Sequence, residues 1–376
     1  MAGMRAMGWL VLVAACGAGD EADPVGTADA DTDADTDGDT DTGGWAAPAG
    51  ARSLGIEVNP PGGEDYIAQL DAAVAEGVTV VPLTLHWSVL EPEPGVFDLT
   101  LLDLGASAFR EAGVKMSLSI PTADTVLTSA PPDLQPGLAD GSLTWADPVV
   151  IQRFEALLVE VLDHGGDDLA HLIVANEVDI WFIGRTDEDV AALKGFSDWM
   201  EDVAERTHPD LPVGVSVTHE GLADERLPWV VEEHDAVFVT YYQRGNDFSG
   251  EPAKDVPSVE ESLDEVVAWA AGKPLVFKEF GYATGAAIGG SEPGQVDFVE
   301  DLFAAWDAHG DAIDTIIFSR MFDSPRAQCE EEAELYGLGG NEAFIDFLCT
   351  LGLHDEDFAA KPGWTTFQVE SGRRGF

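Results

Sequence analysis

The chain has 376 residues, of which 45% are hydrophobic, so it is long enough to bury the core of one large domain or of two ordinary ones. Its formal net charge is −53 at pH 7, and ten of its 71 acidic residues lie between Asp20 and Asp41. Because so many carboxylates repel phosphate groups, the charge argues against nucleic acid and acidic lipid headgroups as partners.

The first 16 residues have the layout of an export signal. One cation, Arg5, precedes the apolar residues 8–13, which are too few to span a membrane, and small residues follow up to Cys16. Residues 13–16, Val-Ala-Ala-Cys, resemble the bacterial lipobox, which implies that Cys16 becomes the lipidated first residue of the mature protein. An ordinary signal peptide that leaves Cys16 unmodified is the alternative. We expect an exported protein tied to the bacterial cell envelope only by this lipid anchor.

Residues 17–50 consist mainly of Asp, Thr, Ala and Gly and show no apolar periodicity. Such a composition cannot form a packed core, and its alternating aspartates repel one another, so we predict an extended tether. A calcium-binding loop is the alternative, but the glycine and glutamate spacing of an EF-hand is missing. The tether would hold the folded body, residues 51–376, away from the membrane.

After Arg52, short β-rich apolar runs alternate with longer amphipathic stretches, the pattern of parallel strands joined by helices. Strands are predicted at residues 53–58, 78–85, 114–120, 171–176, 211–217, 235–241, 274–279 and 313–319. Helices are predicted at residues 66–76, 99–112, 148–163, 187–206, 258–271 and 295–309. An open doubly wound sheet rarely needs eight strands and usually shows a glycine-rich phosphate turn, which is missing here. The pattern therefore predicts one (β/α)8 barrel.

Two of the predicted strands end in a glutamate. The fourth ends in Asn176-Glu177 and the seventh in Lys278-Glu279. Barrel enzymes carry their active groups at the C-terminal ends of the strands. Two carboxyl groups that face each other across a barrel mouth can cleave a glycosidic bond, because one protonates the leaving oxygen while the other attacks the anomeric carbon. A single such acid is as often a helix cap or part of a loop ion pair, but two together predict a catalytic pair.

Several segments match, in order and spacing, the motifs of one enzyme superfamily. They are His86-Trp87-Ser-Val-Leu-Glu91 continuing to Asp98, Asn176-Glu177-Val-Asp179, Thr240-Tyr241-Tyr242, Lys278-Glu279-Phe-Gly-Tyr282, and Gly352-Leu-His-Asp355 with Lys361-Pro-Gly-Trp364. Over nearly all of residues 53–370 the body resembles the clan A glycoside hydrolases, which are retaining β-glycosidases on a (β/α)8 barrel. The segments that begin at Asn176 and Thr240 are most similar to the endo-galactanase branch, whereas the segment from Trp87 to Asp98 is common to the cellulase, mannanase and β-galactosidase branches.

This resemblance implies that the protein cleaves β-linked saccharides by double displacement through a covalent glycosyl-enzyme. It makes Glu177 the general acid/base, Glu279 the nucleophile, Asn176 the partner of the sugar 2-hydroxyl and Tyr242 a hydrogen-bond donor to Glu279. Tyr242 shares a strand face with Thr240 and should therefore point into the mouth. Further substrate contacts are expected at His86, Trp87, Trp145, Asp179, Trp181 and Arg320.

Two positions depart from the family pattern. Many clan members carry an arginine on strand two beside the nucleophile, but residues 83–86 offer none, so His86, Lys278 or Arg320 would have to supply its hydrogen bonds. The tryptophan that often ends strand eight is replaced by Phe318-Ser-Arg320. For the three tryptophans named above, packing in the core remains as open as contact with sugar.

Cys329 and Cys349 remain once Cys16 is assigned to the anchor. An even pair of cysteines in an exported protein predicts a disulfide, with two buried thiols as the alternative.

Two other functions stay open. The missing arginine and tryptophan could mark a surface-displayed carbohydrate-binding protein on a degenerate barrel, although both glutamates are retained. A metal-dependent hydrolase would need His and Asp ligands together at the strand ends, whereas His86 and His219 are isolated. We therefore expect a monomer that takes a carbohydrate as its substrate and uses neither a metal nor a cofactor.

Overall fold

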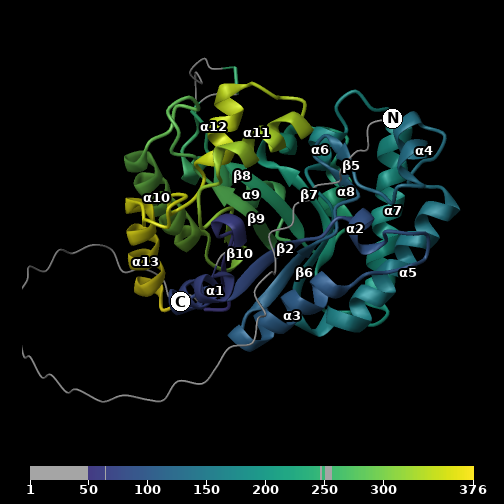
Figure 1. Ribbon diagram of the computed structural model, residues 1–376, viewed down its shortest axis with the longest axis horizontal. Coiled ribbons are helices and arrows are strands. Elements are labelled where there is room, and N and C mark those ends of the chain that lie inside the picture. Colours follow the sequence, from purple (N-terminus) through teal and green to yellow (C-terminus); the bar gives the residue numbers. More distant parts are fainter. Residues whose placement is uncertain (1–49, 64, 246–247, 250–255) are drawn as a thin grey trace, which may run out of the picture.

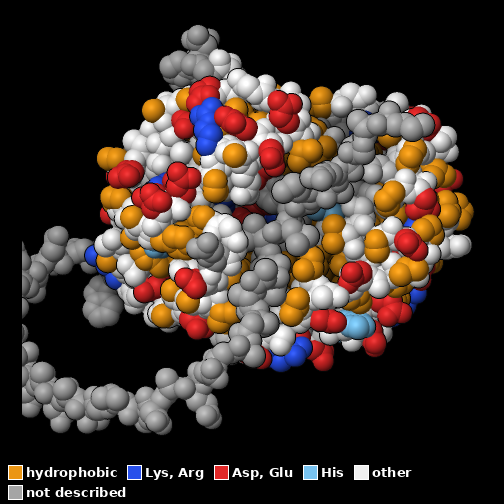
Figure 2. Space-filling model, in the orientation of Figure 1, with side chains coloured by type: hydrophobic (Ala, Val, Ile, Leu, Met, Phe, Trp, Pro, Cys, Tyr) orange, Lys and Arg blue, Asp and Glu red, His pale blue; other side chains and the backbone are white. Residues whose placement is uncertain are grey.

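The structure is a computed structural model that describes residues 50–63, 65–245, 248–249 and 256–376. The predicted export signal with Cys16, and the tether up to residue 49, lie outside the described residues. Within the described ranges, no helix has the length and the apolar character needed to cross a membrane. The face drawn in Figure 2 shows more acidic (red) than basic (blue) side-chain surface, in agreement with the strongly negative net charge of the chain.

Eight parallel strands close into a barrel in the order β1-β10-β9-β8-β7-β6-β3-β2 (Figure 1). They are β1 (Ser53–Ile56), β2 (Val80–Thr84), β3 (Lys115–Ser119), β6 (Leu169–Ala175), β7 (Val213–Thr218), β8 (Val237–Tyr242), β9 (Leu275–Gly281) and β10 (Ile313–Phe318). Each predicted strand is found within a few residues of its expected bounds, and the (β/α)8 barrel is confirmed. Two short strands, β4 (Ala123–Asp124) and β5 (Leu127–Thr128), form an antiparallel hairpin after β3.

Helices surround the barrel on its outside (Figure 1). Those predicted correspond to α1 (Tyr66–Ala75), α3 (Thr100–Ala112), α5 (Pro148–Gly165), α7 (Asp187–Glu205), α9 (Val259–Trp269) and α10 (Glu292–His309). The others are α2 (Trp87–Leu90), α4 (Gln135–Asp140), α6 (Val178–Trp181), α8 (Pro228–Glu232), α11 (Arg326–Leu335), α12 (Glu342–Cys349) and α13 (Pro362–Arg374). Short polar residues fix some of the helix starts, because Thr186 and Ser258 form capping boxes at α7 and α9.

The first strand and the last helix are tied together where the barrel closes. Arg52, just before β1, donates to Asp307 of α10 at 3.0 Å, and Arg374 of α13 donates to the same carboxylate at 2.7 Å. Phe367 of α13 packs edge-on against Phe318 of β10, with the ring centroids 5.0 Å apart. These contacts join the two ends of the described chain around one core.

A helical hairpin, α11 with α12, is inserted between β10 and α13 and lies over the C-terminal ends of β8 and β10 (Figure 1). A disulfide joins Cys329 of α11 to Cys349 of α12, with the Cα atoms 5.7 Å apart. Phe347 of α12 packs edge-on against Tyr242 at the end of β8, with ring centroids 5.1 Å apart. Arg320, just after β10, donates to the carbonyl of Leu348 at 2.7 Å. The hairpin is thus fixed beside the barrel mouth.

Candidate active site

Glu177 follows β6 in an unusual backbone conformation. Its φ of 46° and ψ of 53° lie in the left-handed region, which a residue other than glycine keeps only when its surroundings hold it there. Its backbone N–H donates to the hydroxyl of Ser216 on β7 at 3.1 Å. Its carboxylate accepts hydrogen bonds from Thr125 at 2.9 Å and from Thr240 at 2.7 Å. Contacts from the β4–β5 turn, β7 and β8 therefore aim this carboxyl group into the mouth.

Glu279 lies at an irregularity of β9. Val239 of β8 is paired with Phe277, but the next residue, Thr240, is paired with Glu279, so Lys278 is an extra residue in β9. In a regular strand Lys278 and Glu279 would point to opposite faces of the sheet. A bulge breaks this alternation and often re-aims a side chain beside an active site. It places the Lys278 ammonium 2.8 Å from the Glu279 carboxylate.

Two donors hold the Glu279 carboxylate. Lys278 forms the ion pair with Oε1, and the Tyr242 hydroxyl donates to Oε2 at 2.6 Å. The same hydroxyl lies 2.7 Å from Oγ of Ser319, which follows β10. Tyr242 thus points into the mouth, and Lys278, of the three donors considered in place of the strand-two arginine, makes the direct contact with Glu279.

Thr240 of β8 links the two glutamates. Its hydroxyl donates to Glu177, and its backbone is paired in register with Glu279 on the adjacent strand β9, so the two carboxyl groups lie near each other. Burial and the negative charge of Glu279 raise the pKa of Glu177 to about 7. Burial acts in the same direction on Glu279, but Lys278 and Tyr242 outweigh it and hold the pKa of Glu279 below its ordinary value. Near neutral pH the mouth therefore contains a carboxyl group that can give up a proton and, beside it, an ionised carboxylate.

Asn176 is fixed between the two glutamates and the β4–β5 hairpin. Its amide donates to Asp124 at 3.0 Å, and its Oδ1 accepts from Ser216 at 2.8 Å and from Lys278 at 2.7 Å. Among the described residues, the second amide N–H has no acceptor. It is available to a sugar hydroxyl, which is the role that the resemblance implied.

Asp179 does not face the mouth. It is buried on α6 and accepts hydrogen bonds from the backbone N–H and the hydroxyl of Thr218, at 2.8 and 2.7 Å. Both carboxylate oxygens thus fasten α6 to β7. We therefore correct the expected sugar contact of Asp179 to a structural one, which supports the segment that carries Glu177.

The three tryptophans expected near the substrate are core residues instead. Trp87 is fully buried and donates to Glu91 at 2.8 Å. Trp145 and Trp181 are 2% and 5% exposed, and their rings pack against each other with centroids 6.3 Å apart. Trp181 also lies under the guanidinium of Arg185. Rings with so little free surface offer no flat face to a sugar, so the packing alternative holds for all three.

The two remaining predicted contacts differ in position. His86 is half-buried and directly precedes α2, and its Nδ1 atom lies 3.2 Å from the hydroxyl of Ser129. A contact with substrate stays a prediction for this residue. Arg320 is buried and donates to Ser324 at 2.6 Å and to Glu332 of α11 at 3.1 Å. We correct its expected substrate contact, because its guanidinium anchors the α11–α12 hairpin. Its positive charge also helps to lower the pKa of Glu279.

The structure adds a third acid to the barrel mouth, Glu57, which was not predicted from the sequence. Glu57 follows β1 at the same end of the barrel as the two catalytic candidates and is half-buried. Burial raises its pKa to about 7, against the opposing charge of Arg320, and the charge of Glu279 adds to the rise. The signal that singled out Glu177 and Glu279, an acid directly after an apolar run, applies to Glu57 as well.

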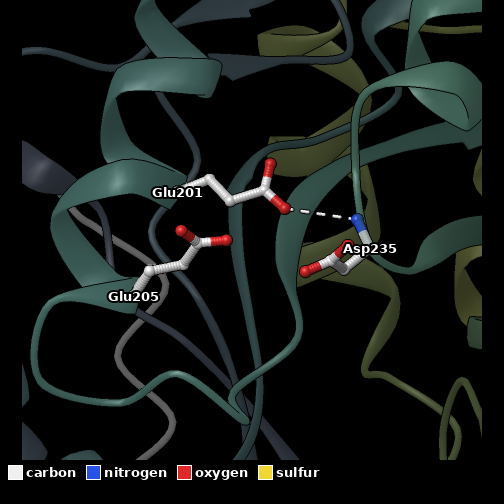
Figure 3. A group of neighbouring side chains, drawn as sticks. All are labelled: Glu201, Glu205 and Asp235. Carbon is white, nitrogen blue, oxygen red and sulfur yellow. Dashed lines mark hydrogen bonds between the residues drawn. The ribbon is translucent and has the colours of Figure 1, made fainter.

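One group of acids in the described ranges has the spacing of metal ligands, and it lies away from the mouth. Glu201 and Glu205 come from the end of α7, and Asp235 precedes β8 (Figure 3). One oxygen of Glu201 accepts from the backbone N–H of Asp235 at 3.2 Å, and the other accepts from Nδ1 of His234. Since protein donors already satisfy Glu201, the group is explained without a metal ion.

No protein-family model matches the sequence. No curated protein matches it either. Among solved structures, a GH5_18 protein from Bifidobacterium longum subsp. longum in complex with Manβ1-4GlcNAc is 14% identical, with a TM-score of 0.65 over 86% of this chain and 78% of that chain. An exo-β-1,4-mannosidase from Opitutaceae bacterium strain TAV5 is 19% identical, with a TM-score of 0.65 over 88% of this chain and 61% of its own.

A family 39 glycoside hydrolase from the gut symbiont Bacteroides cellulosilyticus is 14% identical, with a TM-score of 0.60 over 85% of this chain and 64% of its own. The chain therefore spans less than two thirds of two of these three proteins. At such low identity the likeness concerns the fold. The protein has the (β/α)8 barrel fold that these glycosidases share.

Proposed function

We propose that the protein is a retaining glycoside hydrolase that cleaves β-linked oligosaccharides or polysaccharides. The observation that carries the proposal is the pair of neighbouring carboxyl groups, Glu177 and Glu279, whose pKa values are shifted in opposite directions. A pair of titratable groups separated in this way has the properties of an acid and a nucleophile. The fold shared with known glycosidases agrees with this chemistry.

In the first step, Oε of Glu279 attacks the anomeric carbon while the bond from that carbon to the leaving oxygen breaks. Glu177 transfers its proton to the leaving oxygen, so the departing sugar leaves as an alcohol. Lys278 and Tyr242 keep Glu279 ionised until it attacks. The product of the step is a glycosyl ester of Glu279 beside an ionised Glu177.

In the second step, Glu177 takes a proton from water, and the water oxygen attacks the anomeric carbon from the side that the first leaving group vacated. The bond to Glu279 breaks, and the carboxylate is released with its electron pair. Formation of the ester removes the negative charge of Glu279, which is one cause of the raised pKa of Glu177. The pKa of Glu177 therefore falls when it has to act as a base and rises again when the ester is hydrolysed.

The test is hydrolysis of a panel of β-linked polysaccharides and aryl β-glycosides by the full chain, followed by NMR of the first sugar anomer released. Double displacement predicts that the β-anomer is formed first and mutarotates later. An α-anomer formed first would contradict the proposed nucleophile. Binding of saccharides without any hydrolysis would support the carbohydrate-binding alternative instead.

We also propose export and a lipid anchor at Cys16, supported by the small residues that precede it. Replacing Cys16 by Ser should move the protein from the membrane fraction to the soluble fraction of the cells that express it, whereas Cys349→Ser should leave it at the membrane. A wild-type protein found only in the soluble fraction would contradict the anchor.

A further inference from the structure

The α11–α12 hairpin carries a row of aromatic rings that leads to the candidate nucleophile. Tyr242, the donor to Glu279, packs against Phe347 with centroids 5.1 Å apart. Phe347 stacks on Phe344 at 6.2 Å, and Phe344 contacts Tyr336 edge-on at 5.6 Å. Tyr336, at the end of α11, is therefore the fourth ring of a row that begins at the mouth with Tyr242.

Four acids near the barrel mouth interact electrostatically with Tyr336. The charges that act on it belong to Asp124, Glu177, Glu279 and Glu332, which come from β4, the ends of β6 and β9, and α11. Together with the ring contacts of the hairpin, these interactions place Tyr336 beside the mouth. Burial is the main reason why the pKa of Tyr336 is raised well above its ordinary value, and the carboxylates add to it. The phenol therefore keeps its proton and remains a donor.

Among the described residues, no group accepts a hydrogen bond from this donor. In the ranges that the structure describes, the Tyr336 side chain makes a ring contact with Phe344 but its hydroxyl forms no hydrogen bond. The side chain is half-buried, so part of its surface is open to a ligand. A sugar bound between the two glutamates would bring hydroxyl oxygens into this space.

The hairpin holds Tyr336 in place before any ligand arrives. The disulfide between Cys329 and Cys349 joins its two helices, and Glu332, one turn before Tyr336, is paired with the buried Arg320. Asn341 caps α12 at 3.1 Å, so the turn between the helices is also fixed. A donor that is already ordered loses little conformational entropy on binding.

We propose that Tyr336 is a substrate-binding residue whose hydroxyl donates to a hydroxyl group of the sugar unit held between Glu177 and Glu279. The inference rests on the proposed function, because it takes a glycosyl unit as the ligand. It assigns the α11–α12 hairpin, which lies outside the eight strand and helix units of the barrel, a part in selecting the sugar.

The test compares the full-length protein with its Tyr336→Phe variant, which loses only the hydroxyl. On an aryl β-glycoside that the parent hydrolyses, kcat/KM should fall about five- to tenfold, the effect of one neutral hydrogen bond. Substrates that lack one hydroxyl each locate the contact: on one of them, wild type and variant should react equally, because the bond is already missing. Tyr282→Phe is the matched control, since that ring packs under α10 against Phe298.

A second measurement keeps the inference separate from the proposed reaction. Calorimetry on Glu279→Gln, with and without Tyr336→Phe, measures binding of the same glycosides without turnover, and the second substitution should weaken binding about fivefold. Equal kcat/KM of Tyr336→Phe and wild type on every substrate would overturn the role of Tyr336 and leave the hydrolase intact. Binding that Tyr336→Phe weakens in a parent that hydrolyses nothing would support the role of Tyr336 and overturn the reaction. Neither hydrolysis nor binding would overturn both.

Discussion

Each of the two sides of the barrel mouth holds a glutamate, but the groups that surround Glu177 differ from those that surround Glu279. Glu177 accepts hydrogen bonds from the uncharged hydroxyls of Thr125 and Thr240, so burial and the negative charge of Glu279 dominate and its pKa rises to about 7. Glu279 is equally deep in the mouth, but the ammonium of Lys278 brings a full positive charge to it and its pKa falls. Neighbouring groups, more than the strand position of each glutamate, therefore decide which one is the acid and which the nucleophile.

Removing the ionised carboxylate, Glu279, should have the largest effect on activity. Glu279→Gln leaves a neutral amide that cannot attack the anomeric carbon, and we expect kcat to fall on the order of 10⁵-fold. Thermal unfolding should change little, because a side chain that faces the mouth contributes little to the core. The control is Glu300→Gln, the same change on an exposed residue of α10. More than a tenth of wild-type activity in Glu279→Gln would contradict its role.

Removing the proton donor, Glu177, should lower activity by an amount that depends on the leaving group. Glu177→Gln cannot donate a proton, so kcat should fall roughly 10²- to 10⁴-fold on an unactivated glycoside and far less on a dinitrophenyl glycoside. Azide should restore turnover of the activated substrate and give a β-glycosyl azide, since it replaces the water that needs a base. An equal loss on both substrates would show that Glu177 is not the acid.

Replacing Lys278 by an uncharged residue should bring the pKa values of Glu177 and Glu279 closer together. Lys278→Met takes away the charge that favours the ionised form of Glu279, so the pKa of Glu279 should rise. Because catalysis needs this carboxylate ionised, the acidic limb of kcat/KM should move by roughly one unit to higher pH. The exposed Lys115 offers the matched control, Lys115→Met. An acidic limb that does not move in Lys278→Met would mean that the ion pair does not set the ionisation.

Removing the Thr240 hydroxyl, which donates to Glu177, should have the smallest effect of these substitutions. Thr240 donates to the ionised form of Glu177 and lowers its pKa, so Thr240→Val should raise that pKa above about 7. Since Glu177 must be protonated in the first step, the basic limb of kcat/KM should shift by roughly half a unit to higher pH. Thr365→Val, at an exposed position of α13, should leave both limbs unchanged. A shift of the basic limb to lower pH would contradict the assignment.

The barrel could be predicted because its strands are apolar runs of regular length and its helices are amphipathic. The same pattern exposed the candidate acids, since a charged residue that ends a buried run stands out in a sequence. It also contained Glu57, which follows β1 in the same way. Glu57 was missed because the family motifs, and not the strand ends alone, guided the choice of residues.

The incorrect predictions of substrate contacts concern residues in the connections between strands, where the sequence shows no hydrophobic periodicity. Trp87 and Trp181 sit on short helices of four residues, and nothing in the sequence indicates which way their rings turn. Asp179 was expected at the sugar because it belongs to a motif, but its partner, Thr218, lies 39 residues further along the chain on β7. The bulge that turns Lys278 toward Glu279 also depends on strand pairing, so Lys278 could be named only as one of three donors.

The most direct test of the account is to identify the residue that becomes covalently bound to sugar. An activated 2-deoxy-2-fluoro-β-glycoside of a sugar that the protein hydrolyses should form the glycosyl ester and release it slowly, because the fluorine disfavours the positive charge of the transition state. Peptide mass spectrometry should then find the sugar on Glu279, and Glu279→Gln should remain unlabelled. A label on Glu177 or Glu57, or steady hydrolysis by a protein that never becomes labelled, would contradict the assignment.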